Sequence, residues 1–240
     1  MTTPVLYEKI EAAALITLNR PEKRNAISEE LLIHLYNRLE EADEDPAVRC
    51  VILTGAGDSF CAGLDLNRIV TDNLMDPRGD GRGLIEIVSS LKKPLVGAIN
   101  GHAITGGFEL ALNCDFLIAS ENASFTDTHA RMGIHPGWGM SYLLARAVGL
   151  RMAKQMSFTA EKINAERARE LGLVNEVVPR GFLIPRCLEI ARSIAMANPE
   201  MLVMYKSVIR REAHETLGAA VETEKKEFRE FLQWAGALKA

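Results

Sequence analysis

The sequence has few cysteines and no cluster of metal ligands. Its four cysteines, Cys50, Cys61, Cys114 and Cys187, are widely separated and lie within or beside apolar runs. Such spacing is typical of reduced, buried thiols rather than of a disulfide framework. No C-x-x-C pair or histidine-rich tract indicates a metal. We therefore expect neither disulfides nor a metal site.

Excess positive charge and long apolar runs are also missing. The 28 lysines and arginines are outnumbered by 32 aspartates and glutamates, which gives a net charge of -4. A chain with this balance does not attract a polyanion, so we expect no nucleic-acid partner. No apolar run approaches the length of a membrane span, and residues 1–4 do not begin a signal sequence. These absences predict a cytoplasmic protein that has no membrane partner.

The chain does have enough apolar sequence for a large α/β core, since 48% of its 240 residues are hydrophobic. Helical patterns separate most of the runs that are typical of strands. These runs cover residues 15–18, 50–54, 95–99 and 116–119. Ser28 is placed to cap a helix in which Leu31, Leu35 and Leu39 recur at four-residue spacing. That helix is expected to pack one side on the sheet.

The second half of the chain is mostly helical after residue 143. Helices are expected over residues 145–159, 165–171 and 183–197, with an extended piece over 173–178. A last amphipathic region, from residue 200 to about 232, can fold back on its own domain or pack on a neighbouring subunit. The irregular stretch 68–83 is either a surface connection or a wall over a site.

Two glycine-containing segments carry the chemistry. Residues 59–66 read SFCAGLDL, and residues 100–110 read NGHAITGGFEL. Glycine permits close backbone approach, so an amide N–H can face a bound carbonyl oxygen, and Leu64 and Gly106 are the expected donors of an oxyanion hole. Glu109 then lies one turn into the helix that Gly106 opens, where a carboxylate can move a proton beside that carbonyl. Either motif alone also fits a tight turn.

Both motifs in this order resemble the enoyl-CoA hydratase/isomerase, or crotonase, superfamily. The other matching segments are residues 18–26 (LNRPEKRNA), Phe125, 133–139 (GIHPGWG), 145–149 and 168–174. The resemblance implies an α/β fold in which residues 1–180 form a crotonase-like spiral of repeated ββα units. It also implies a C-terminal helical trimerisation or lid region at 181–240. A trimer or dimer of trimers and an acyl-coenzyme A thioester substrate, with no separate cofactor, are implied as well.

By that similarity, the amides of Leu64 and Gly106 hold the thioester oxygen. The residues implied in binding substrate or coenzyme A are Arg24, Ala26, Ala62, Asp65, Leu66, Asn67 and Trp138. Arg24 also fits an ordinary surface charge, and Trp138 also fits a core aromatic. His102 is expected to be a packed histidine rather than a catalyst.

The sequence departs from the family at one catalytic position. Family hydratases pair the carboxylate matching Glu109 with a second glutamate, and His129 occupies that place here. His129 can act as an acid or base, shape the pocket, or only hydrogen-bond Asp127, Arg131 or backbone. Asp127, two residues earlier, is expected to face the other side.

The predicted reaction is hydration of a trans-2-enoyl-CoA through a stabilised enolate, with Glu109 and His129 as catalytic residues. Isomerisation, thioester hydrolysis and decarboxylation are alternatives within the same superfamily. A non-catalytic acyl-CoA-binding subunit is the alternative of a different class.

Overall fold

The computed structural model describes residues 3–213 and 215–237. The chain divides into two compact units, Met1–Met196 and Ala197–Ala240. The first unit extends beyond residue 180, where the sequence placed the boundary. Helix α8 (Leu183–Ala195) explains the difference, because its side chains Leu183, Cys187 and Ala191 are buried in a cluster with sheet residues.

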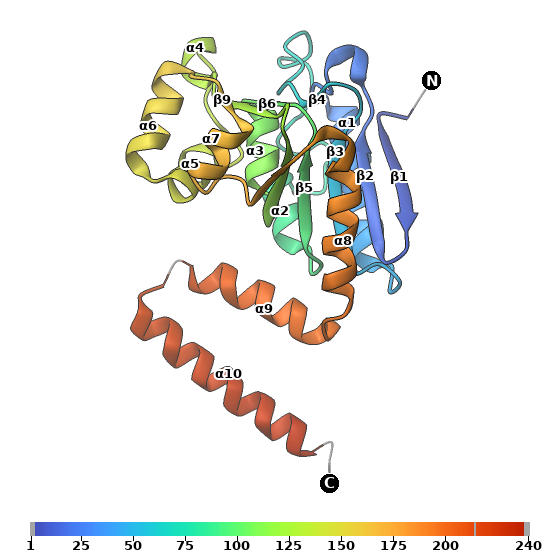
Figure 1. Cartoon of the computed structure of the whole chain (residues 1–240), viewed down its shortest axis with the longest axis vertical. Coiled ribbons are helices and arrows are strands. Elements are labelled where there is room, and N and C mark those ends of the chain that lie inside the picture. The colour runs from blue at the N-terminus through green and yellow to red at the C-terminus, as the bar shows by residue number, and fades with distance from the viewer. Residues whose placement is uncertain (1–2, 214, 238–240) are drawn as a thin grey trace. The chain divides into compact units, whose positions relative to one another are not determined.

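Two sheets build the first unit (Figure 1). The larger one has the order β1-β2-β3-β5-β7-β10, and all its pairs are parallel except β1 with β2. Its strands are β1 (Val5–Ile10), β2 (Ala13–Leu18), β3 (Cys50–Gly55), β5 (Leu95–Ile99), β7 (Phe116–Ser120) and β10 (Glu176–Val178). The smaller sheet contains β4 (Ser59–Cys61), β6 (His102–Ile104), β8 (Ser124–Thr126) and β9 (Ile163–Asn164). All four predicted strands are confirmed.

After β1, β2 and α1, three successive repeats each give one strand to each sheet and then a helix. β3 and β4 precede α2 (Leu84–Ser90), β5 and β6 precede α3 (Gly106–Leu112), and β7 and β8 precede α4 (His129–Met132). This is the repeated ββα arrangement that the resemblance implied. It brings the ends of β4, β6 and β8 side by side, because these strands are neighbours in the smaller sheet.

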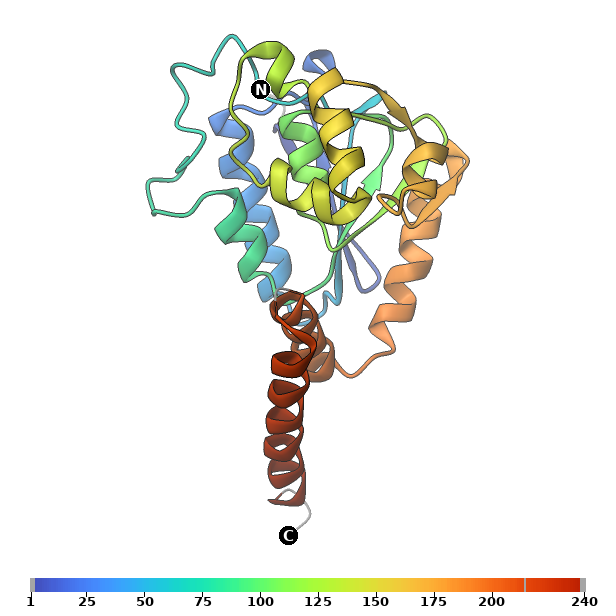
Figure 2. The ribbon, with the colours of Figure 1, turned by 90° about the vertical axis from the view of Figure 1, so that its left-hand side faces the viewer.

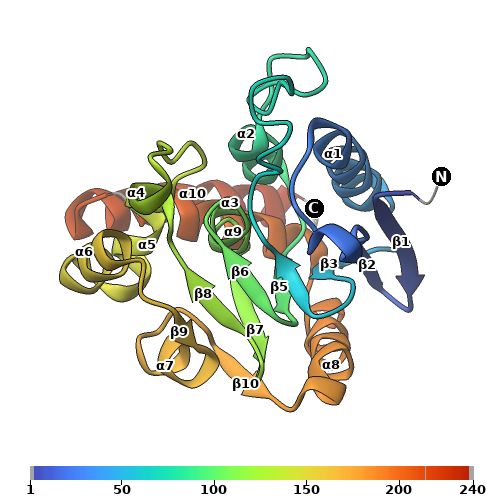
Figure 3. The ribbon, with the colours of Figure 1, turned by 90° about the horizontal axis from the view of Figure 1, so that it is seen from above.

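Helices cover both faces of the larger sheet, as Figure 3 shows, with α1 (Glu29–Glu44) and α8 on opposite sides. The predicted cap is confirmed, since the Leu31 N–H donates to Ser28 Oγ at 3.3 Å. Leu31, Leu35 and Leu39 of α1 are fully buried. Every residue of β3 is buried, which explains why this strand reads as a continuous apolar run rather than an alternating one.

The predicted helix over 145–159 is wrong in one respect. Two helices, α5 (Met140–Val148) and α6 (Leu150–Thr159), occupy this stretch. Gly149 separates them with a φ of +80°, a left-handed conformation that glycine adopts without steric cost and that an α-helix does not contain. The next helix, α7, covers Ala165–Glu170 as expected, and short 3-10 turns occupy Pro21–Lys23 and Arg180–Phe182.

The second unit consists of α9 (Pro199–Glu212) and α10 (Leu217–Ala237). Asn198 caps α9 by accepting a hydrogen bond from the Met201 N–H at 3.0 Å. A groove of about 440 Å³ lies within this unit. Its lining residues are Met201, Met204, Tyr205, Val208, Val221, Glu224, Lys225, Glu227, Phe228 and Phe231. Of the helices described, none combines the length and the apolar character needed to cross a membrane.

Candidate active site

The Leu64 amide is turned away from its neighbouring segment by a short parallel pairing. The Ile27 N–H donates to Gly63 O at 2.8 Å, and the Asp65 N–H donates to Ile27 O at 2.8 Å. In a parallel pairing of this kind, the N–H of the residue between the two bonds points to the opposite side. No hydrogen bond among the described residues uses the Leu64 N–H. This amide is therefore available to a ligand.

The Gly106 amide is presented by a strained turn. Thr105 has φ +51° and ψ -110°, a conformation that costs a non-glycine residue about 1–3 kcal/mol. Its N–H donates to Thr126 O at 2.9 Å, and its hydroxyl accepts the Thr128 N–H at 3.1 Å. Gly106 then opens α3, where a first-turn N–H has no acceptor within the helix. The Gly106 N–H donates no hydrogen bond to any acceptor among residues 3–213 and 215–237.

The two glycine segments meet, as predicted. A Cβ placed on Gly63 would lie 3.4 Å from Gly106 N, and one placed on Gly106 would lie 3.3 Å from Leu64 Cδ2. A Cβ on Gly107 would lie only 2.2 Å from Cys61 O. The start of α3 therefore packs directly on the backbone of β4, and the two free amides belong to one site.

We expect Gly107→Ala to lower stability by about 3 kcal/mol or more, at the upper end of the usual cost of overpacking, because the clash is with backbone. For a chain of this size that corresponds to a fall in Tm of about 6–12 °C, measurable by thermal melting. Gly181→Ala is the control, since a Cβ there meets no atom within 4 Å. Equal melting of the two variants would mean that α3 can move away from β4 at little cost.

Glu109 lies one turn into α3 and is 2% exposed. Its Oε1 accepts hydrogen bonds from the Trp138 N–H at 2.8 Å and the Met140 N–H at 3.2 Å. Its Oε2 lies 3.4 Å from His129 Nε2. Trp138, just before α5, and Met140, its first residue, thus orient the carboxylate and leave its second oxygen facing the histidine.

His129 is the first residue of α4 and is 5% exposed. Its Nδ1 lies 2.7 Å from Asp127 Oδ1, while its Nε2 faces Glu109. Burial lowers the pKa of His129, but the hydrogen bonds and charges of Asp127 and Glu109 outweigh burial and raise this pKa to about 9. His129 is therefore a cation at neutral pH, flanked by two carboxylates.

Asp127 does not face away from His129, so that expectation is wrong. β8 ends just before Asp127, and Thr128 leaves the extended conformation with φ -106° and ψ 8°, so the alternation of side chains along a strand does not apply to residues 127–129. The Asp127 carboxylate is buried and accepts both the N–H and the Nδ1–H of His129. The hydrogen bond between His129 and Asp127 that the third interpretation named is present, together with the contact to Glu109.

The other expected binding residues lie along the paired segments around Leu64. The Ala62 N–H donates to Arg24 O at 3.0 Å, and Ala26 accepts a hydrogen bond from Arg20 Nη1 at 2.5 Å. The Arg24 side chain is exposed, and Leu66 and Asn67 are exposed beyond Leu64. The structure therefore gathers Arg24, Ala26 and Ala62 at one edge of the site.

Asp65 is occupied by an ion pair that the sequence did not reveal. Arg20 Nη2 lies 3.1 Å from Asp65 Oδ2, and the aspartate side chain is 8% exposed. Asn25 was also missed: it is fully buried, and its Nδ2 donates to Ala56 O and Ser59 O. Both side chains tie the 20–26 loop to the strand that leads to Leu64. No local sequence pattern predicts either contact, because the partners are about 31 to 45 residues apart in the sequence.

Trp138 lies beside the expected oxyanion hole. Its Cζ3 is 3.4 Å from the position of a Cβ on Gly106, and the side chain is 3% exposed. The stretch 68–83 approaches the same segment, since Met75 Sδ lies 3.7 Å from the position of a Cβ on Gly137. This loop has no helix or strand (Figure 2). Its contact favours the interpretation of the loop as a wall of the site.

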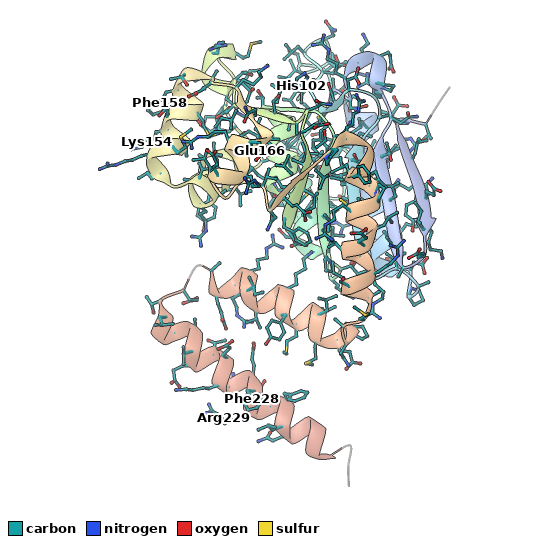
Figure 4. All side chains as sticks on the ribbon, in the orientation of Figure 1. His102, Lys154, Phe158, Glu166, Phe228 and Arg229 are labelled. Atoms are coloured by element: carbon teal, nitrogen blue, oxygen red, sulfur yellow. The ribbon has the colours of Figure 1, made fainter. Side chains whose placement is uncertain are left out.

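Two further features lie outside this constellation. His102, labelled in Figure 4, has its Nδ1 2.7 Å from Ser124 Oγ, which agrees with a packed histidine. Within the described part of the chain, no group of three or more His, Cys, Asp or Glu side chains is arranged to hold a metal ion.

Residues 8–237 match the family model described as enoyl-CoA hydratase/isomerase. The Arabidopsis thaliana protein named "Probable enoyl-CoA hydratase 1, peroxisomal" is 41% identical over 88% of this chain and 80% of its own length. Crotonyl-CoA hydratase of Syntrophomonas wolfei is 37% identical over 88% of this chain and 83% of its own. The crystal structure of an enoyl-CoA hydratase from Bacillus anthracis has a TM-score of 0.87 and 35% identity, and the match covers 96% of this chain and 91% of that one.

Proposed function

Because the chain belongs to the enoyl-CoA hydratase/isomerase family, we propose that it is a lyase that hydrates trans-2-enoyl-CoA thioesters. One observation supports this most strongly. The buried carboxylate of Glu109 lies between a histidine cation and a segment that packs on Gly106, beside two amides that no described residue uses. A candidate base, a candidate acid and two hydrogen-bond donors for an oxyanion are thus assembled in one buried place.

In the proposed reaction, the N–H groups of Leu64 and Gly106 bind the thioester oxygen. Glu109 accepts a proton from water, and the water oxygen forms a bond to the β carbon. The electron pair of the C=C bond shifts to the bond between the α carbon and the thioester carbon, and the carbonyl π pair moves onto the thioester oxygen, where the two amides stabilise the enolate. The enolate collapses as His129 Nε2 gives its proton to the α carbon, and the proton on Glu109 returns to His129 across the 3.4 Å contact. No separate cofactor takes part.

The binding of the remainder of the substrate is also a proposal. Leu66, Asn67 and Trp138 line the acyl and pantetheine portions, and the exposed guanidinium of Arg24 pairs with a coenzyme phosphate. Ala26 and Ala62 border the nucleotide end through their backbone. Asp65 contributes by holding this edge in place through Arg20.

Isomerisation is the second candidate, because a single carboxylate can remove a proton at one carbon and return it at another. Glu109 has one acid partner of a different chemical type, His129, rather than a second glutamate. A silent acyl-CoA binder is the candidate of another class.

The deciding experiment follows the loss of conjugated enoyl-thioester absorbance and identifies the products. A 3-hydroxyacyl-CoA product supports hydration, and a shifted double bond supports isomerisation. Free coenzyme A or carbon dioxide would indicate hydrolysis or decarboxylation. Measurable binding with no turnover across acyl, enoyl and malonyl thioesters would contradict an enzymatic function.

We also propose that α9 and α10 mediate assembly into a trimer or a dimer of trimers. Two helices alone cannot enclose an apolar core, and large side chains of this unit stay exposed: Tyr205 is 61%, Ile209 65% and Phe228 60% exposed. Exposed apolar surface of this kind is typical of association sites. A second copy of the chain supplies the matching surface.

Phe228→Asp should therefore reduce the assembly to monomers, because a buried unpaired carboxylate at an interface is strongly unfavourable. Sedimentation velocity measures the mass directly. Arg229→Ala is the neighbouring control, and both residues are labelled in Figure 4. A trimer that persists in Phe228→Asp would remove this face from the interface.

A further inference from the structure

Asp127 is placed to control His129 from two sides. It follows β8 directly and is 2% exposed. Its Oδ1 accepts the His129 backbone N–H at 3.1 Å and lies 2.7 Å from the ring Nδ1. One oxygen atom therefore fixes both the start of α4 and the rotation of the imidazole.

The aspartate is itself held in this position. Ser157 of α6 donates a hydrogen bond to the Asp127 carboxylate. Burial raises the pKa of Asp127, but the hydrogen bonds from His129 and Ser157 outweigh it and lower this pKa below its ordinary value. Asp127 is thus an ionised, acceptor-only group, so Nδ1 of His129 must carry a hydrogen.

The second ring nitrogen then faces the reacting side. Nε2 lies 3.4 Å from Glu109 Oε2. The charged groups that face the ring are Asp127 in its own segment and Glu109 on α3; α6 contributes the neutral Ser157 hydroxyl to Asp127. Arg131 of α4 is directed elsewhere and donates to Thr159 O. The ionised Asp127 and the protonated His129 together carry no net charge.

We infer that Asp127 is a positioning residue for the proposed hydration: its carboxylate orients His129 and retains the proton on the ring, so that the pair replaces a protonated second carboxylic acid. Without the negative charge of Asp127, burial would favour loss of the ring proton. His129 would then be neutral at the pH where the enzyme works and could not supply a proton to the α carbon. This inference rests on the proposed function.

Asp127→Asn tests the inference because it keeps the size and the accepting oxygen while removing the charge. We expect the alkaline fall of kcat/KM to move from about pH 9 toward neutral pH. At pH 8.5 the variant should be roughly tenfold slower once the pKa of His129 has fallen by about 1.5 units from its value of about 9, because the protonated fraction falls tenfold per unit only above the pKa. The ring titration of His129, followed by NMR with ¹³C-labelled histidine and assigned with His129→Gln, should move in the same direction.

Ser157→Ala is the second variant, and it should produce a smaller shift of the same sign without touching His129. Asp43→Asn is the matched control, because Asp43 Oδ1 also accepts two N–H groups, here the backbone amides of Lys92 and Lys93, outside the site. A His129 titration that stays near pH 9 in Asp127→Asn would overturn the inference. Absence of hydration in the wild type, together with a shifted titration, would contradict the proposed function but not the role of Asp127.

Discussion

Replacing Glu109 by glutamine is expected to lower kcat for enoyl-CoA hydration by about a thousandfold, within the 10²–10⁴-fold range of general acid–base catalysis. Glutamine keeps an oxygen that can accept the Trp138 and Met140 amides, so the fold and substrate binding should persist. It cannot accept a proton from water. Its NH₂ group would also face His129 Nε2–H, which replaces an attraction by two opposed donors.

Glu86→Gln provides the matched control for this result. Glu86 is also a first-turn glutamate of a seven-residue helix, and its Oε2 accepts the Gly83 N–H at 3.0 Å. We expect this variant to hydrate at the wild-type rate, as measured by loss of enoyl absorbance. If Glu109→Gln were equally active, the carboxylate would have no part in the reaction. A selective rise in KM would instead assign it to binding.

The second large effect is expected for His129→Gln, which should lower kcat about a hundredfold by removing the proton donor. The wild-type rate should stay level up to about pH 9 and then fall as the imidazolium loses its proton. The variant should lack this alkaline fall. Measuring both kcat and kcat/KM between pH 6 and 10 tests the two expected results. His102→Gln serves as the control, since His102 is a histidine with a hydroxyl partner elsewhere in the small sheet.

The pH dependence of folding stability provides an independent test of the protonation of His129. Folding raises the pKa of His129 from 6.5 to about 9, so the folded state binds the proton more tightly than the unfolded state. The resulting stabilisation is complete below pH 6.5 and is lost as the pH rises through 9. This part of the pH dependence of Tm should vanish in His129→Gln. A variant with the wild-type activity profile would leave His129 as a structural residue only.

The strands and the two glycine motifs could be predicted from the sequence because local rules determine them. β3 and β5 are short, continuous apolar runs, and Ser28 precedes a clear helical repeat. The close approach at Gly107 needs glycine, since a Cβ there would lie 2.2 Å from Cys61 O. Such positions carry a strong residue preference that one sequence can reveal.

The long-range contacts of the site could not be predicted in the same way. The strained Thr105 is held by Thr126 and Thr128, and nothing in the sequence around Thr105 marks it. The ion pair of Arg20 with Asp65 joins two loops that only the fold brings together. The orientation of Asp127 depends on where β8 ends. The cytoplasmic location and the trimer stay predictions of the sequence, and the Arabidopsis relative is named as peroxisomal.

Under the proposed function, the attachment of Glu109 to the segment 137–140 connects the catalytic carboxylate to the irregular loop. The two amides that aim the base belong to the stretch whose Gly137 lies beside Met75 of the irregular loop. An acyl chain long enough to displace Met75 would therefore also disturb the segment whose two amides hold the Glu109 carboxylate. Redesigning the loop to admit larger substrates would then change turnover as well as selectivity, and the two properties would have to be optimised together.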